Sequence, residues 1–141
     1  MSWKSKSVAI GALLCVVALA ADRAPWRVHS LKSLEYPPIA ASARLEGTVE
    51  LALDIGRDGS VRKVTVRSGH SLLAEAAETN AKEWRFDPPS EGADQPSIEC
   101  CKMIYTFRIV GDCEAQRCPT IFSFEAPDHV TVETKAPHWQ R

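Results

Sequence analysis

The stretch TVELALDIGRDGSVRKVTVRS, residues 48–68, decides the fold of this chain. Every second side chain from Val49 to Ile55 is apolar, which is the period of a strand that buries one face. Asp58-Gly59 follows, and its glycine supplies the positive φ that a tight antiparallel connection needs. The alternation resumes at Val64 and Val66. The stretch therefore predicts a β-hairpin.

The hydrophobic period changes to that of a helix from Ser71 onward. Leu73, Ala77 and Trp84 fall on one helical stripe, while the charged residues lie largely elsewhere. The pattern predicts an amphipathic helix of about fourteen residues, with Ser71 as its N-cap and its end before a Pro-Pro pair. Residues 87–97 are rich in Pro, Ser, Gly and acidic side chains and predict a surface loop.

Two further β segments follow that loop. Residues 101–109 alternate in polarity and predict a third strand whose apolar face meets the helix. Residues 121–132 predict a weaker hairpin, and residues 39–45 predict a short helix that Gly47 closes. The fold class is therefore α+β: a small antiparallel sheet, made of the hairpin and the third strand, packed by a short and a longer helix, with an additional C-terminal β-hairpin.

The apolar positions of these elements predict the core. Aromatic side chains bury the largest apolar area, so Trp84 and Phe86 are expected to anchor it. The expected core residues are Val49, Leu51, Leu53, Val64, Val66, Leu73, Ala77, Trp84, Phe86, Tyr105 and Phe107.

The N-terminus predicts export. Two lysines precede an uncharged run from Val8 to Ala21, and Ala18 and Ala20 form an A-x-A-like cleavage site. We expect a cleavable signal peptide over residues 1–20 and a periplasmic mature chain. Two alternatives stay open: an inner-membrane anchor, for which the run is short, and a lipoprotein that uses Cys15.

The cysteines suit an oxidising compartment, because an even number remains once the signal is removed. Cys113 and Cys118 enclose a short loop, so this pair is the preferred disulfide. Cys100 and Cys101 are neighbours in a strand and point to opposite faces, so we expect one of them to be a buried free thiol. The other pairings of the four stay open.

Composition and spacing argue against several classes of function. Basic and acidic side chains number 17 and 18, without the basic stripe that nucleic acid demands. The cysteines lack C-x2-C pairs and the histidines are scattered, so we expect no metal and no cofactor. Ser68-Gly69-His70-Ser71 lacks the G-x-S-x-G elbow, and the glycines form no phosphate loop. We therefore expect no enzymatic activity.

A set of motifs runs in order from Tyr36 to Ile109. Its members are Tyr36-Pro37, Ala43-Arg44, Gly47, Val49, Asp58-Gly59, Ser68-Gly69, Leu73, Ala76-Ala77, Trp84-Arg85-Phe86 and Pro88. This set resembles the C-terminal domain of the TonB family. The sequence departs from the family pattern at Ala74, where the family tends to carry Asp, and at Asn80, where it tends to carry a small apolar residue.

The resemblance implies a function in binding. TonB uses this domain to grip a short peptide of outer-membrane receptors as an added β-strand. We accordingly expect a periplasmic protein-binding module, associated with TonB-dependent transport, whose partner is an envelope protein or peptide such as a receptor segment. The partner-binding residues we expect are Tyr36, Pro37, Arg44, Tyr105 and Arg108; for Tyr36, a ring that packs against the turn is the alternative. The alternative is a structural envelope domain without a transport role that forms a homodimer through its edge strands.

The expected organisation is a signal peptide (1–20), a lead-in without clear period (21–35), a TonB-like domain (36–110), a C-terminal β extension with the cysteine loop (111–134) and a flexible tail (135–141). Before Tyr36 the sequence shows neither a competent membrane span nor a long Pro-rich spacer, so we expect no relay of energy. If residues 121–132 pair with the third strand, they cover the edge that a peptide would use, and the binding surface lies elsewhere.

Overall fold

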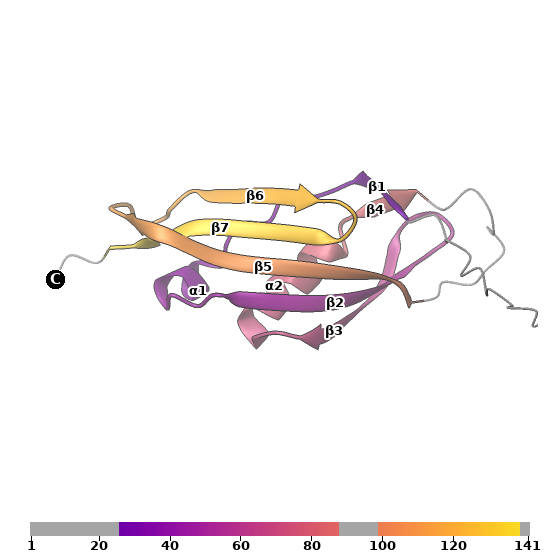
Figure 1. Ribbon diagram of the computed structural model, residues 1–141, viewed down its shortest axis with the longest axis horizontal. Helices are drawn as coiled ribbons and strands as arrows, with labels where there is room; N and C mark the ends of the chain where they lie inside the picture. Colours follow the sequence, from indigo (N-terminus) through magenta and orange to yellow (C-terminus); the bar gives the residue numbers. More distant parts are fainter. Residues whose placement is uncertain (1–25, 88–98, 139–141) are drawn as a thin grey trace, which may run out of the picture.

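The computed structural model describes residues 26–87 and 99–138 (Figure 1). The elements in chain order are β1 (Arg27–Ser30), α1 (Pro38–Ser42), β2 (Gly47–Ile55), β3 (Val61–Ser68), α2 (Ser71–Ala81), β4 (Arg85–Asp87), β5 (Glu99–Cys113), β6 (Thr120–Glu125) and β7 (His129–Pro137). The predicted α+β class is confirmed. The expected signal peptide and nearly all of the expected loop 87–97 lie outside the described residues.

β2 and β3 form the hairpin that the alternating stretch predicts. Their antiparallel register places Leu53 opposite Val64. In the turn, the Asp58 carboxylate accepts hydrogen bonds from the hydroxyl and the amide of Ser60 at 2.6 and 3.1 Å, and these bonds lower the pKa of Asp58. Gly59 takes a φ of +81°, which L side chains rarely adopt. Both residues of the Asp-Gly pair are therefore used by the turn.

β5 is the central strand of a five-stranded sheet with the order β3–β2–β5–β7–β6 (Figure 1). It pairs antiparallel with β2 on one side and parallel with β7 on the other. The hairpin and the third strand are antiparallel, as expected. The C-terminal hairpin joins the same sheet through a parallel pair, because β7, rather than β6, lies beside β5. At 15 residues, β5 is also longer than the predicted strand.

The two helices lie on one face of this sheet, and no other described helix or strand covers the opposite face (Figure 1). Along β5, Met103, Tyr105 and Phe107 are buried, whereas Lys102 and Arg108 are exposed. These two cations pair across strands, Lys102 with a β2 glutamate at 3.5 Å and Arg108 with a β7 glutamate at 3.2 Å. Charge pairs of this kind are typical of the wet face of a half-buried sheet.

The predicted core residues are buried, except on β3. The buried ones are Val49, Leu51, Leu53, Leu73, Ala77, Trp84, Phe86, Tyr105 and Phe107. Val64 is half-buried and packs against the core, while Val66 is 39% exposed, so its assignment to the core is wrong. Both belong to β3, which has a neighbouring strand on one side of the described sheet. Alternation identifies the inner face of an edge strand, but it does not show how far the face is covered.

α2 ends earlier than the hydrophobic stripe predicts. It stops at Ala81, and Trp84-Arg85-Phe86 leaves the helix to enter β4. β4 pairs antiparallel with β1, in the lead-in where the sequence shows no clear period. Each of these strands has at most four residues, which is too few for alternation to show, and each is stabilised by the other.

Two other boundaries differ from expectation. The N-cap of α2 is His70 rather than Ser71, because His70 Nδ1 accepts a hydrogen bond from the Leu72 amide at 3.3 Å. At the other end of the chain, β7 continues to Pro137 and buries Ala136, so the first residues of the expected flexible tail belong to the sheet.

Asn80 is buried on α2 and is hydrogen-bonded at both ends of its amide. Its Nδ2 group donates to the carbonyls of Lys32 and Ser33 at 2.9 and 3.3 Å. Its Oδ1 accepts from Trp84 Nε1 at 3.0 Å and from the Tyr105 hydroxyl at 2.9 Å. This departure from the family pattern therefore has a structural reason: Asn80 ties the lead-in, α2 and β5 together.

We predict that Asn80→Leu destabilises the protein by about 3 kcal/mol, because the buried donors of Trp84 and Tyr105 lose their acceptor. The measurement is the free energy of unfolding from urea denaturation. Thr79→Ala is the control, since Thr79 is the exposed neighbour on the same helix, and its change should stay within about 0.5 kcal/mol. Equal stability of the two variants would contradict the role given to Asn80.

A second prediction compares two glycines with the same φ of +81°, Gly59 and Gly111. A Cβ on Gly59 would lie 1.9 Å from the carbonyl oxygen of Phe86, whereas a Cβ on Gly111 would meet no described atom within 4 Å. Gly111→Ala should therefore cost only the backbone strain, about 1 kcal/mol. Gly59→Ala should cost at least about 2 kcal/mol more, because β4 must move. Thermal and urea unfolding of both variants measure the difference.

Candidate functional site

The outer edge of β5, where the resemblance implies peptide addition, is occupied by the chain itself. β7 pairs with β5 in parallel register from Ile104–His129 to Cys113–Pro137. β6 then pairs antiparallel with β7 and lies at the end of the sheet. The C-terminal hairpin thus covers this edge. A peptide cannot add to β5 there, so a binding surface has to lie elsewhere.

The C-terminal hairpin is part of the core. The ring of Trp84 meets Phe124 and Phe122 of β6 edge-on, with centroids 5.3 and 6.5 Å apart. Val130 and Val132 of β7 are fully buried. Opening the β5 edge would therefore expose a tryptophan and two valines to water. The lost burial of apolar area costs roughly 2 kcal/mol per side chain, which adds up to several kcal/mol.

Two strands end the described sheet, β3 and β6. β3 carries Arg62, Lys63 and Arg67, and charged side chains on an edge strand oppose pairing with a further strand. β6 carries a single charged residue, Glu125, and its Ile121 is 62% exposed. Of these two edges, β6 is the less protected against strand addition.

The two tyrosines among the expected partner-binding residues lie inside the protein. Tyr36 is buried, packs edge-on against Phe107 with centroids 5.5 Å apart, and donates its hydroxyl to the Leu45 carbonyl at 2.5 Å. Its amide donates to Thr120 Oγ1 at 3.1 Å, which joins the start of α1 to β6. Tyr105 is fully buried beside Asn80. Pro37, which follows Tyr36, is the half-buried N-cap of α1.

The two arginines of the expected set are exposed and ion-paired. Arg44, which has a φ of +53°, pairs with Asp112 near the end of β5. Arg108 pairs with Glu133 across β5 and β7. The structure therefore does not bring the five expected residues together on one surface: it buries the aromatic members and engages the cationic members within the chain.

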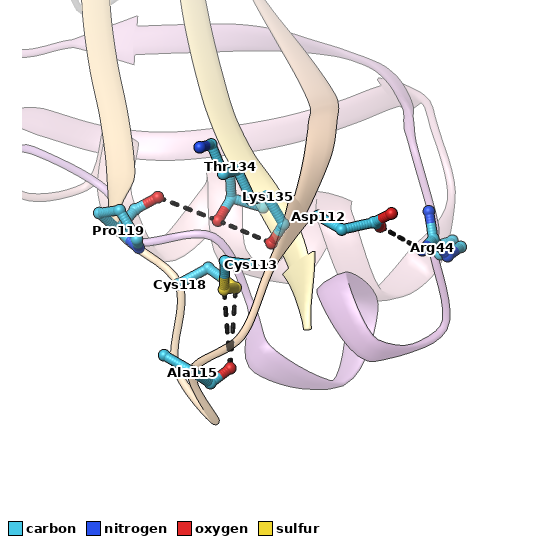
Figure 2. The surroundings of a disulfide bond; sticks show 8 residues. All are labelled: Arg44, Asp112, Cys113, Ala115, Cys118, Pro119, Thr134 and Lys135. Carbon is cyan, nitrogen blue, oxygen red and sulfur yellow. Dashed lines mark hydrogen bonds and ion pairs between the residues drawn. A yellow bond between two sulfur atoms is a disulfide. The ribbon is translucent and has the colours of Figure 1, made fainter. Parts of the chain in front are cut away.

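A cleft of about 410 Å³ lies where α1, the cysteine loop and the end of β7 meet. Cys113, at the end of β5, and Cys118 form the disulfide preferred from their spacing, with Cα atoms 6.1 Å apart (Figure 2). Arg117 and Lys135 stand on the cleft, and neither was among the expected site residues. Their signal in the sequence is weak, because they are 18 positions apart and only the return of β7 beside β5 brings them together.

Clusters of metal-ligating side chains and apolar helices of membrane length are both absent from the described part of the chain. No group of three or more His, Cys, Asp or Glu side chains there could hold a metal ion. His29 pairs with Asp87 at 2.9 Å and His129 with Asp128 at 2.7 Å, so these histidines lie apart. Within residues 26–87 and 99–138, no helix is long and apolar enough to cross a membrane.

We predict that the protein ionises no tyrosine while it remains folded at roughly pH 10.5. Burial, assisted by Glu46, raises the pKa of Tyr36 to about 12, and burial raises the pKa of Tyr105 above its ordinary range. Unfolded tyrosines ionise near pH 10. Above that pH the unfolded chain loses protons that the folded chain keeps, so stability falls as the pH rises toward 12.

The measurement is the tyrosinate absorbance near 295 nm, followed together with circular dichroism. Because the chain has two tyrosines, the full signal should appear only with unfolding. Tyrosinate that forms near pH 10 in the folded protein would contradict the burial of these rings.

Comparison with known proteins gives a family match. No curated protein matches the chain. Residues 32–109 match the family described as Gram-negative bacterial TonB protein C-terminal, a span that runs from the lead-in through most of β5. The match covers more than half of the chain, and the resemblance drawn from its motifs is confirmed. The chain therefore belongs to the TonB C-terminal family.

Proposed function

We propose that this chain is a periplasmic protein-binding module that takes an extended segment of an envelope protein as an added β-strand. Domains of the TonB C-terminal family are protein-interaction modules of the cell envelope. The signal-like pattern of residues 1–20 supports export, and the family supports an association with TonB-dependent transport and an outer-membrane receptor segment as partner.

The position of β6 at the edge of the described sheet carries this proposal. A peptide that adds a strand needs a row of unpaired backbone groups. β5 has neighbours on both sides, β2 and β7, so it offers no such row. β6 has β7 on one side, and among the described residues none of the backbone hydrogen bonds outside the strand ladders involves residues 121–125.

The side chains of β6 suit a partner strand. Ile121, Ser123 and Glu125 point away from the helices, and Ile121 is 62% exposed. Phe122 and Phe124 point inward against Trp84 and hold the strand in place. A rigid strand loses little conformational entropy on binding, so the backbone of β6 and Ile121 already have the conformation that a partner strand would contact.

The same edge supports a second candidate, a homodimer. Two copies of β6 can pair antiparallel about a two-fold axis, because such an interface uses the same patch on both subunits. Ile121, which is exposed in the single chain, would then be covered. This candidate corresponds to a structural envelope domain without a transport role.

We predict that a photo-crosslinker, benzoylphenylalanine, placed at Ser123 captures a discrete product in the envelope fraction of the producing cell. Ile121→Lys should reduce the yield about tenfold, because it puts a charge where a partner strand would cover an apolar side chain. Ile39→Lys is the matched control, since Ile39 is 70% exposed and belongs to α1 rather than to β6.

The mass of the product separates the two candidates. A product of twice the chain mass identifies the homodimer, and any other discrete mass identifies a partner protein. The same crosslinker at Thr65, on the opposite edge strand β3, should capture neither. No product at Ser123, or an equal product at Thr65, would overturn the assignment to β6.

A further inference from the structure

The cleft beside the disulfide has a buried floor and a polar rim. Tyr36, Ala41 and Thr134 contribute to the lining and are buried, while Arg117 and Lys135 contribute to it and are exposed. Thr134 Oγ1 donates to the Pro119 carbonyl at 3.1 Å, so the floor holds no unsatisfied hydroxyl there. No carboxylate is among the residues that line the cleft in the described chain. Apolar floors with a few convergent polar groups are typical of ligand sites.

The two cations on the rim differ from the ion-paired basic residues of the protein. Lys32, Arg44, Lys82, Lys102 and Arg108 each form an ion pair. In the described residues neither Arg117 nor Lys135 has an acidic side chain within ion-pair distance. Glu114 belongs to the same loop as Arg117 but does not line the cleft. The rim therefore offers two positive charges that an anion can approach from solvent.

We propose that this cleft binds a carboxylate carried by a peptide, with the carboxylate between Arg117 and Lys135 and an adjoining apolar side chain against Tyr36 and Ala41. Arginine and lysine are the side chains that bind carboxylates through charge-assisted hydrogen bonds. The inference rests on the proposed protein-binding function and adds a second contact point, separate from the edge of β6.

The disulfide holds one wall of this site. Cys118 lines the cleft next to Arg117, and the bond to Cys113 ties this part of the loop to the end of β5 (Figure 2). β7 is held beside the same end of β5 by a hydrogen bond from the His138 amide to the Cys113 carbonyl at 2.8 Å. Both cations are thus positioned from one point of the sheet, which reduces the conformational entropy lost on binding.

The test uses three N-acetylated tripeptides with the oxidised, ¹⁵N-labelled protein at low salt: Ala-Val-Leu with a free carboxylate, the same peptide as its amide, and Ala-Glu-Leu as its amide. A tripeptide spans roughly 10 Å, which is too short for stable strand addition along β6. We expect the free acid to shift the backbone amide signals of residues 117, 118 and 134–136, and the Ala-Val-Leu amide to leave them unchanged.

The third peptide identifies the source of the carboxylate. Binding of the Ala-Glu-Leu amide as well as the free acid assigns the site to any peptide carboxylate. Binding of the free acid alone assigns it to a chain terminus. Equal shifts from the Ala-Val-Leu amide and acid, or shifts confined to other residues, would overturn the proposal.

Charge variants complete the test. Arg117→Gln with Lys135→Gln should weaken binding of the free acid roughly fivefold to tenfold, as expected for two exposed ion pairs. The control removes the same charge with Lys63→Gln and Lys102→Gln on the solvent face of the sheet, and its affinity should match that of the unaltered protein. Unchanged affinity of the first variant would overturn the proposal, whereas crosslinking at Ser123 would stand, because the tripeptides do not report on β6.

Discussion

Trp84 must be buried and hydrogen-bonded at the same time, and the rest of the structure depends on how this is achieved. Its ring is fully buried, with Phe86 stacked on one side and Phe122 and Phe124 edge-on. Its indole N–H donates to Asn80 at 3.0 Å. A buried indole without an acceptor would lose about 1–3 kcal/mol. One side chain thus joins α2, β4 and β6, which are distant in the sequence.

This arrangement determines where a partner can bind. Because β6 contributes its aromatic side chains to Trp84, the C-terminal hairpin belongs to the core, and β7 closes the edge of β5. The strand addition that we propose therefore lies two strands further out, at β6. The same return of β7 places Lys135 near the disulfide loop and forms the cleft with Arg117. Packing around one tryptophan therefore closes the outer edge of β5 and positions the two surfaces that we propose for binding.

The candidate sites show why local pattern predicts the fold better than function. The expected contacts at Tyr36 and Tyr105 came from aromatic residues in the family motif and in the third strand, yet both rings pack inside, because burial depends on what covers a residue. Val66 shows the opposite outcome: the alternation predicts a buried side chain, but the side chain is exposed because its strand lies at the edge of the sheet. Lys135 lay in an expected tail, and nothing local to it indicates a cleft.

The sequence by itself determined the β2–β3 hairpin, α2, the third strand and the preferred disulfide, because each depends on residues close together in the chain. Only the tertiary structure decided the pairing of β1 with β4, the parallel placement of β7 beside β5, and the position of β6 at the edge of the described sheet. These features depend on contacts between distant segments, and their free energy comes from burying apolar area jointly. Because that area is shared between elements, the pattern of a single segment does not predict which elements pack together.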